Sequence, residues 1–337
     1  SAASDVYKRQ IQEIADRAGV SPATVSRALR GLHHVNPQTR KKVLDAAREL
    51  GSHNPDSSLV PKLVESIGVV TPYISRWFFA SAIEGIERGL QDAGMDLLLY
   101  NFNQIKGRSR IFHDSQTQKK IEGMIVVTMP LDDDEINALK DWDIPVVLCG
   151  VRHEGFSSVR IDDVSGARQA TQHLIDLGHT KIAIMSGEQQ NPFHFPVHKY
   201  RKDGFIEALN EAGIEFNPQF EYFADFTYKT AYALMKDALN RKERPTAIFC
   251  ESDEMAYGVM QAIKDAGLRC PEDISVIGFD NHSMAEFAGL TTIAQPVNIQ
   301  GEMAVWLLLE KLNNHNTEVK ELMVPTNLIV RRSTAAI

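Results

Sequence analysis

The sequence has few cysteines and no long apolar segment, and each absence excludes a class of protein. Its 337 residues include only three cysteines and no Cys-x-x-Cys pair, so neither a disulfide framework nor a structural zinc site is expected. No apolar run approaches the roughly 18 residues that cross a bilayer, and the first thirty residues lack the apolar core of a signal peptide. We therefore expect a protein of the reducing cytoplasm that does not enter a membrane.

The common sequence signatures of catalysis and of metal binding are also missing. The chain contains no Gly-x-Ser-x-Gly elbow, no phosphate-binding Gly-rich loop and no His-Glu-x-x-His motif. His194 and His198 are four residues apart, but Pro196 between them disfavours a regular helix and no carboxylate is adjacent. The acidic run Asp132–Glu135 falls at a predicted helix start, where it complements the helix dipole. We expect no enzyme activity, no cofactor and no metal.

The charges that are present are unevenly distributed. The chain carries 36 basic and 44 acidic residues, for a formal net charge of −8. The first 62 residues, however, hold ten basic residues and six acidic ones, so this segment carries +4 and the remainder −12. An acidic total argues against a nucleic-acid partner, but a small basic segment attached to an acidic body is typical of a nucleic-acid-binding module.

Three short helices are predicted in the basic segment. Apolar residues recur at i, i+3, i+4 and i+7 over residues 11–18, and Gly19 ends that run. Ser21-Pro22 has the pattern of a capping residue followed by a first helical residue, and Asn36-Pro37 repeats it. Two short helices joined by a Gly-containing turn indicate a helix-turn-helix. The alternative is a generic three-helix bundle with a solvated basic face.

The sequence of this segment resembles a known DNA-binding signature. Residues 11–31 read IQEIADRAGVSPATVSRALRG, which is similar to the pattern AGVSxxTVSRxLNG of the LacI/GalR family of transcription regulators. Among proline, alanine and arginine side chains, only arginine can contact guanine O6 and N7 in a bidentate manner, which is worth about 1–3 kcal/mol of discrimination. The resemblance implies that the base-facing residues are Pro22, Ala23 and Arg27, and that Ser21, Thr24, Ser26 and His34 hold phosphates. The expected partner is a palindromic double-stranded operator bound by a homodimer, with repression as the outcome.

The linker that follows departs from the family pattern. Family members usually read YxPNxxARxL there and form a hinge helix whose leucine wedges into the minor groove. Here residues 52–61 read SHNPDSSLVP, and Pro61 disfavours a helix across that point. Leu59 is the candidate wedge. The alternative is an extended hinge, with binding that depends more on the major groove.

From residue 66 onward, short apolar strands alternate with amphipathic helical patterns. Such alternation predicts parallel sheets covered on both faces. There are too many strands for one open sheet, and the interruption at Asp162-Asp163 predicts two lobes of about six strands each. Because ligands bind beyond the carboxyl ends of such strands, two facing lobes should form a cleft. The strand candidates are 67–71, 97–100, 124–128, 146–149, 182–186, 247–250 and 276–279.

The resemblance extends over nearly all of this acidic body. Segments such as Ile67–Val70, Ile277–Asp280 and Leu290–Thr292 stand at the family's spacings, which implies a body similar to periplasmic sugar-binding proteins with three crossovers between its lobes. The predicted fold class is α/β with a small all-α helix-turn-helix head. The predicted domains are a head at 1–52, a hinge or linker at 53–65, an N-terminal lobe at 66–161 with 294–323, and a C-terminal lobe at 162–291 with 324–335.

The effector site is predicted from the resemblance and from the chemistry of sugars. The resemblance implies that Arg201 and Asp280 are effector anchors and that Gln295 lies at a third contact position. A sugar presents hydroxyl groups and an apolar ring face, so its site needs planar polar groups and an aromatic platform. For any single phenylalanine the alternative is core packing. The further candidates are Ser75, Arg76, Phe78, Phe79, Phe226 and, in a segment longer than the family norm, Phe195.

The leading hypothesis is therefore a regulator whose effector changes the angle between the lobes. A ligand can do this only through different affinities for the two arrangements. A sugar is the expected effector, and a nucleoside, a nucleobase or a phosphocarrier protein partner is the alternative. An α/β enzyme and a solute-binding protein are alternatives of other classes. The absent catalytic motifs argue against the first of these, and the N-terminal head argues against the second.

Overall fold

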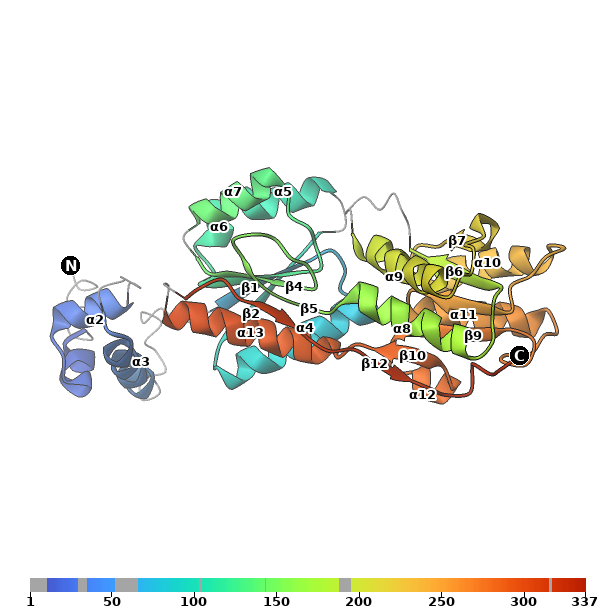
Figure 1. Cartoon of the computed structure of the whole chain (residues 1–337). Helices are drawn as coiled ribbons and strands as arrows, with labels where there is room; N and C mark the ends of the chain where they lie inside the picture. The colour runs from blue at the N-terminus through green and yellow to red at the C-terminus, as the bar shows by residue number, and fades with distance from the viewer. Residues whose placement is uncertain are drawn as a thin grey trace. The chain divides into compact units, whose positions relative to one another are not determined.

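The computed structural model describes residues 11–29, 35–51, 66–102, 105–142, 144–187, 195–314 and 317–337 (Figure 1). The chain divides into two compact units, Ser1–Glu65 and Ser66–Ile337. We call the first the head and the second the body, and we describe each by itself. None of the helices in the described ranges combines the length and apolar character that crossing a bilayer requires.

The head is a small helical unit whose helices begin where local sequence predicts. Residues 11–18 are helical, α2 spans Pro22–Leu29 and α3 spans Pro37–Gly51. The Ser21 hydroxyl accepts a hydrogen bond from the Thr24 backbone N–H at 3.2 Å, and the Asn36 side chain accepts one from the Gln38 N–H at 2.9 Å. Both predicted caps are therefore confirmed. The buried apolar residues of the head are Ile11, Ile14, Ala15, Val25, Ala28, Val43 and Ala46.

The first sheet of the body is fully parallel. Its six strands run in the order β11-β5-β4-β3-β1-β2. We call this sheet and the helices that cover it the N-terminal lobe. In Figure 1, α4 and α13 lie on one side of the sheet and α5, α6 and α7 on the other. The strands are β1 Ser66–Thr71, β2 Asp96–Asn101, β3 Gly123–Val127, β4 Val146–Cys149, β5 Ser157–Arg160 and β11 Glu321–Met323. The helices are α4 Trp77–Asp92, α5 Ile105–His113, α6 Ser115–Gln118, α7 Asp133–Asp141 and α13 Val297–Asn313.

The second sheet also has six strands, in the order β12-β10-β9-β8-β6-β7. We call this sheet and its helices the C-terminal lobe. The expected parallel pairing holds for the other strands of this sheet, whereas the edge strand β12 is antiparallel to β10. The strands are β6 Ile182–Ser186, β7 Glu221–Phe223, β8 Ala247–Cys250, β9 Ser275–Asp280, β10 Thr291–Ala294 and β12 Asn327–Ile329. The helices are α8 Asp163–Asp176, α9 Val197–Glu211, α10 Tyr228–Leu239, α11 Asp253–Asp265 and α12 Ala285–Ala288, with a 3-10 turn at Pro218–Phe220.

The chain passes between the two sheets three times. The passages lie between β5 and β6, between β10 and β11, and between β11 and β12, as the resemblance implies. Two sheets of six strands confirm the expected number of strands in each lobe. The residue bounds of the lobes stay a prediction. The predicted bounds assign residue 294 to the N-terminal lobe, whereas β10 carries residues 291–294 as one strand of the second sheet.

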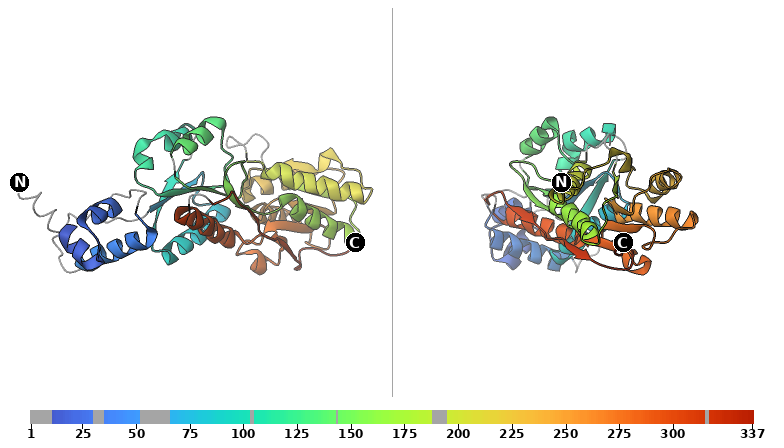
Figure 2. Two further views of the ribbon diagram at one scale, coloured as in Figure 1. Left: turned by 60° about the vertical axis from the view of Figure 1, so that its left-hand side comes forward. Right: turned by 45° about the vertical axis from the view of Figure 1, so that its right-hand side comes forward.

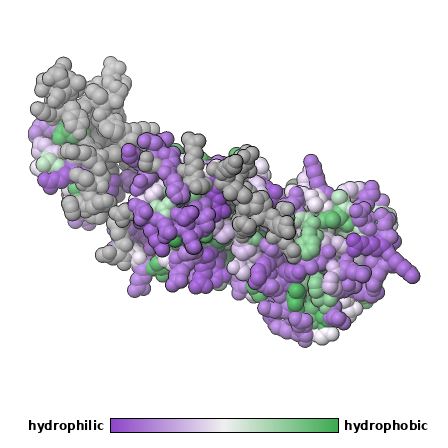
Figure 3. Space-filling model, turned by 90° about the horizontal axis from the view of Figure 1, so that it is seen from above, coloured by the Kyte–Doolittle hydropathy of each residue, from purple (hydrophilic) through white to green (hydrophobic). Residues whose placement is uncertain are grey.

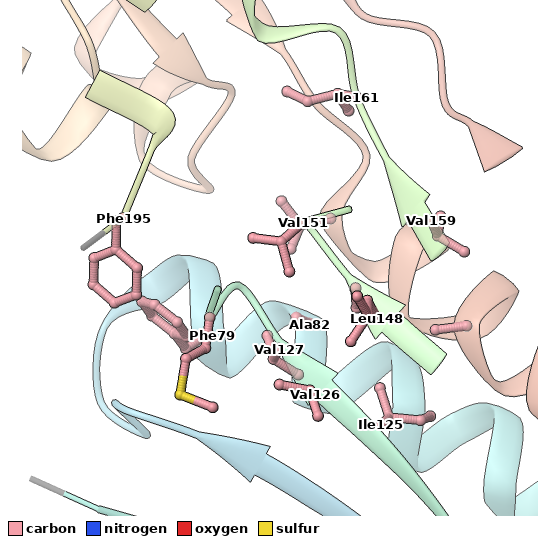
Figure 4. Close-up of a cluster of buried hydrophobic side chains, with 14 of the residues drawn as sticks. Phe79, Ala82, Ile125, Val126, Val127, Leu148, Val151, Val159, Ile161 and Phe195 are labelled. Atoms are coloured by element: carbon pink, nitrogen blue, oxygen red, sulfur yellow. The ribbon is translucent and has the colours of Figure 1, made fainter. Parts of the chain in front are cut away.

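The helices of the body pack in pairs whose apolar sides face the sheets. Helix α4 packs on α13, α8 on α9 and α10 on α11, and the views in Figure 2 show helices on both faces of the sheets. A close-up of part of a buried apolar cluster shows Val126 and Leu148 on the neighbouring strands β3 and β4 (Figure 4). The face of the body seen in Figure 3 is mostly hydrophilic with scattered apolar residues, as expected for helices with one buried side.

Candidate functional site

The exposed face of α2 carries the predicted base-facing residues. Pro22, Ala23 and Arg27 are all exposed. Arg27 also lines a surface hollow of about 370 Å³ with Ser21 and Thr24, next to the start of α3. Within the head, the structure thus brings one predicted base-facing residue together with two predicted phosphate-holding residues. His34 and Leu59 lie outside the described residues, as does the side chain of Ser26.

Local chemistry explains how Ser21 and Thr24 are positioned. Besides capping α2, the Ser21 hydroxyl lies 2.9 Å from the Thr24 hydroxyl, so the two groups share one hydrogen bond. Each hydroxyl keeps capacity for another partner, because a hydroxyl can both donate and accept. The start of α2 is also a place where backbone N–H groups favour an anion. This arrangement suits contact with a phosphate.

In the body, a cavity of about 560 Å³ is lined by residues of both lobes, a size typical of ligand pockets. Ser75 is exposed and is not among the lining residues, so the structure does not bring it to the site. The other predicted effector residues all line the cavity, namely Arg76, Phe78, Phe79, Phe195, Arg201, Phe226, Asp280 and Gln295.

Arg201 is the buried polar centre of this cavity. It lies on α9, and its Nε donates to Asp163 Oδ1 at 2.9 Å. Its Nη1 donates to the Glu251 carbonyl oxygen and lies 3.7 Å from Asp280 Oδ1. The guanidinium carbon lies 3.6 Å from the centroid of the Phe279 ring. Arg201 thus lies on a helix and has its own acidic partner within the protein.

Asp280 and Gln295 form a second polar group beside Arg201. The Gln295 amide donates to Asp280 Oδ1 at 2.6 Å, and Gln300 donates to Gln295 Oε1 at 3.3 Å. Burial raises the pKa of Asp280 to about 7, although Arg201 and the Gln295 amide favour its ionised form. Burial also raises the pKa of Asp163. Near neutral pH, Asp280 can therefore accept a hydrogen bond or, when protonated, donate one.

Backbone strain is concentrated around this cavity. Four non-glycine residues in the described ranges have positive φ, and three of them line the cavity: Thr128 at 50°, Phe226 at 60° and Asp280 at 125°. The fourth, Asn281 at 55°, follows Asp280 directly. Such conformations cost about 1–3 kcal/mol each and gather at ligand sites. The folded body therefore holds these side chains in place at an energetic cost.

Aromatic side chains contribute to the apolar lining of the cavity. Phe195 is only 6% exposed and packs 6.2 Å from Phe79, centroid to centroid, with both rings visible in Figure 4. These two rings therefore serve core packing as well as lining the cavity. Phe78 and Phe226 are half-buried. Gly187 gives Phe226 room, because a Cβ there would lie 2.0 Å from the ring.

Most of the charges that line the cavity are paired within the protein. Arg152 and Arg160 both form ion pairs with Glu321, at 3.2 and 2.5 Å. Arg201 is paired with Asp163. Three of the four lining arginines thus have acidic partners, and the fourth, Arg76, donates to a backbone carbonyl oxygen, so the arginines offer little net charge to a ligand. The site is therefore better suited to an uncharged polar molecule than to a phosphate ester.

Several lining residues were not predicted from the sequence. They include Trp77, Asp163, Tyr200, Glu254 and Gln300. Asp163 belongs to the pair Asp162-Asp163, which we interpreted only as the boundary between the two lobes. Trp77 stands between two predicted residues, so its position in the chain was the available signal. For Tyr200, Glu254 and Gln300 the sequence shows no comparable signal.

The residues considered for metal binding have other roles where the structure describes them. Asp132 caps α7 and Glu135 completes a capping box, which confirms the helix-start interpretation. His198 Nδ1 lies 2.9 Å from the Phe195 carbonyl oxygen, and His194 is outside the described residues. Within the described part of the chain, no group of three or more His, Cys, Asp or Glu side chains could hold a metal ion.

Comparison with known proteins finds a family model in the head and another in the body. Residues 10–54 match the model of bacterial regulatory proteins of the lacI family, and residues 171–334 match a periplasmic binding protein-like domain. The chain is 33% identical to catabolite control protein A of Priestia megaterium, over 96% of this chain and 98% of that protein. It is 34% identical to the HTH-type transcriptional repressor CytR of Escherichia coli strain K12, over 97% and 96%.

A solved structure extends the likeness to the whole fold. The complex of the transcriptional regulator CelR with cellobiose superimposes with a TM-score of 0.71 at 29% identity, covering 96% of this chain and 99% of the other. CytR and CelR are named as transcription regulators, in agreement with the expectation of a regulator and not an enzyme. On these likenesses, together with the capped α2 and the two-sheet body, the chain belongs to the lacI family of bacterial DNA-binding transcription regulators.

Proposed function

We propose that this regulator is a repressor that binds a palindromic operator as a homodimer and is controlled by an uncharged sugar in the body's cavity. The observation that carries the effector assignment is the buried group of Arg201, Asp280 and Gln295 that lines the cavity of about 560 Å³ together with aromatic side chains. One structural neighbour, the regulator CelR, was solved as a complex with cellobiose. One relative, CytR, is named as a repressor.

The cavity residues match the hydrogen-bonding needs of a sugar. Carboxylate oxygens of Asp280 accept from hydroxyl groups, and the Arg201 guanidinium donates to them. Phe226, half-buried on the lining, offers a surface for the apolar face of a pyranose ring. Because the lining residues come from both lobes, a bound sugar contacts both and favours the arrangement in which both can reach it.

The test is a thermal-shift screen of the full chain against neutral sugars, nucleosides and nucleobases, followed by calorimetric titration of each hit. We expect a sugar hit whose affinity falls about tenfold to a hundredfold in Asp280→Ala, because a buried hydrogen bond to a charged group is lost. Asp280→Asn keeps the shape of the side chain and serves as the variant of choice where Asp280→Ala does not fold. Asp237→Ala, at an exposed residue of α10, is the matched control.

Two results would overturn the effector proposal. A hit whose affinity is equal in the parent, Asp280→Ala and Asp280→Asn would place its binding outside this cavity. Stabilisation by nucleosides or nucleobases and not by sugars would replace the sugar with the alternative effector class.

A further inference from the structure

One short segment of the N-terminal lobe contacts the C-terminal lobe at three separate places. This segment is Tyr73–Phe79, which connects β1 to the first turn of α4, and we call it the lip. Its partners lie in connections of the C-terminal lobe that follow β6, β7 and β9. They therefore lie at the carboxyl edge of that sheet, where the cavity is.

The first contact is aromatic. Phe195 precedes α9 of the C-terminal lobe, yet its ring packs 6.4 Å from Tyr73 and 6.2 Å from Phe79 of the lip, centroid to centroid. Tyr73 and Phe79 themselves meet edge to face at 5.4 Å. Phe195 is 6% exposed. A side chain of one lobe is thus buried against rings of the other.

The second contact is polar. Arg76 Nη1 donates a hydrogen bond to the carbonyl oxygen of Asp225 at 3.2 Å, between β7 and α10. The guanidinium carbon of Arg76 also lies 4.2 Å from the centroid of the Tyr73 ring. Tyr73 therefore supports the arginine from within the lip while the arginine reaches the opposite lobe.

The third contact joins Trp77 to the loop after β9. The indole of Trp77 packs 5.0 Å from the imidazole of His282, centroid to centroid. His282 is itself held edge to face by Tyr257 at 5.5 Å, and its Nδ1 accepts a hydrogen bond from the Met284 N–H at 3.0 Å. The ring that receives Trp77 is thus also held by contacts within its own lobe.

The N-terminus of α4 makes a further favourable contact with the C-terminal lobe. Helix α4 has no side-chain cap of its own, because Arg76 at its N-cap position provides none. Glu254 of α11 in the C-terminal lobe faces the backbone N–H of Trp77, which opposes the rise in the Glu254 pKa that burial causes. A carboxylate is favoured at the positive end of a helix. Here that carboxylate comes from the other lobe.

We propose that the lip is a clasp, which stabilises the closed arrangement of the lobes by direct contacts between protein groups. The contacts join side chains and backbone of the two lobes directly, so they require no bridging molecule. The clasp and a bound effector then contribute separately to the equilibrium between the open and closed arrangements of the lobes. The stability that the clasp gives to the closed arrangement sets how large a difference in effector affinity is needed to shift this equilibrium. This last consequence rests on the proposed function, whereas the clasp itself does not.

The structure provides clean variants, because two residues whose rings make clasp contacts do not line the cavity. These are Tyr73 and His282. His282→Asn removes the ring that receives Trp77, while the asparagine side chain can still accept the Met284 N–H. Tyr73→Leu removes the ring under Arg76 and keeps an apolar side chain. Ser283→Ala, at the exposed neighbour of His282, is the matched control.

The readout is the distribution of distances between spin labels, one on each lobe, in the full chain without added ligand. Labels are placed by Lys140→Cys in α7 and Lys236→Cys in α10, both exposed positions. We expect one dominant distance in the parent and in Ser283→Ala. Molecules with open lobes should give a second distance. The population at this second distance should rise about threefold to tenfold in His282→Asn and Tyr73→Leu, because an aromatic contact is lost.

Identical distance distributions in the parent, His282→Asn and Tyr73→Leu would overturn the clasp. Thermal unfolding of each variant shows whether the body stays folded, and the two variants act on different contacts, so one misfolded variant leaves the other as the test. The measurement uses neither sugar nor DNA. Failure to find any sugar hit would therefore overturn the proposed effector and leave the clasp standing, and the reverse also holds.

Discussion

At Asp280, burial places a carboxyl group where ionisation is costly. Its pKa is raised to about 7, mainly by burial, whereas an unfolded aspartate ionises near pH 4. Between these values the folded chain holds a proton that the unfolded chain has released. The contribution of Asp280 to stability is therefore full below about pH 4 and is lost as the pH rises through about 7.

We predict that Asp280→Asn removes this dependence, because asparagine does not ionise and still accepts from Gln295. The free energy of unfolding of Asp280→Asn minus that of the parent should increase from pH 5 to pH 8. Urea unfolding monitored by circular dichroism at each pH measures it. Asp237→Asn, at an exposed position, controls for general effects of charge removal. A difference that stays constant across this range would contradict the prediction.

At the scale of elements, the close approach of α9 to α8 positions Arg201. A Cβ on Gly204 would lie 2.1 Å from the carbonyl oxygen of Val164 in α8, and Gly204 stands three residues after Arg201 on the same helix. Because the obstacle is backbone and not the end of a flexible side chain, α9 would have to move away from α8. The ion pair of Arg201 with Asp163 depends on that spacing.

We predict that Gly204→Ala destabilises the body by about 1–3 kcal/mol, since overpacking outweighs the better helix propensity of alanine. Chemical denaturation of the full chain measures the loss. Gly107→Ala is the control, because Gly107 is also helical but exposed, and among the described residues its Cβ would meet only Phe102, at an ordinary 3.4 Å. Equal stability of the two variants would show that the helix contact tolerates the added methyl group.

Local features were predictable at this scale and distant contacts were not. The caps by Ser21 and Asn36 depend on residues two or three positions away, so a short stretch of sequence specifies them. The pairing of Arg201 with Asp163 joins residues 38 positions apart, and Trp77 meets His282 only after both lobes have formed. The antiparallel β12 likewise depends on which edge of the sheet is free, which strand composition alone does not indicate.

At the scale of the whole molecule, the charge of the head and the charge of the body have opposite effects on DNA affinity. The first 62 residues carry +4 and the remainder −12. DNA affinity that arises from phosphate contacts falls steeply with salt, whereas discrimination between bases depends on contacts in the grooves. An arginine that reads bases and a lysine that only attracts phosphates should therefore have distinguishable signatures.

We predict that Arg27→Ala lowers the preference for the selected operator over unrelated DNA by about 5-fold to 150-fold, which corresponds to about 1–3 kcal/mol. Lys42→Ala, at an exposed position of α3, should weaken binding to both DNAs by similar factors. Fluorescence anisotropy of the full chain, with an operator found by selection, measures both between 50 and 200 mM salt. An unchanged preference in Arg27→Ala would remove this residue from the base-reading surface.

The passage from β11 to β12 also limits the mechanics of the body. Only residues 324–326 separate a strand of one sheet from a strand of the other, and a chain extends at most about 3.3–3.6 Å per residue. Val324 is buried, and its N–H donates to the Arg160 carbonyl oxygen at 2.8 Å, so part of this tether is fixed to the first sheet. Translation that pulls the sheets apart is thereby ruled out as a large motion. The motion that remains is rotation of one lobe relative to the other about a short axis near residues 324–326. The side of the cavity farthest from this connection then moves the most.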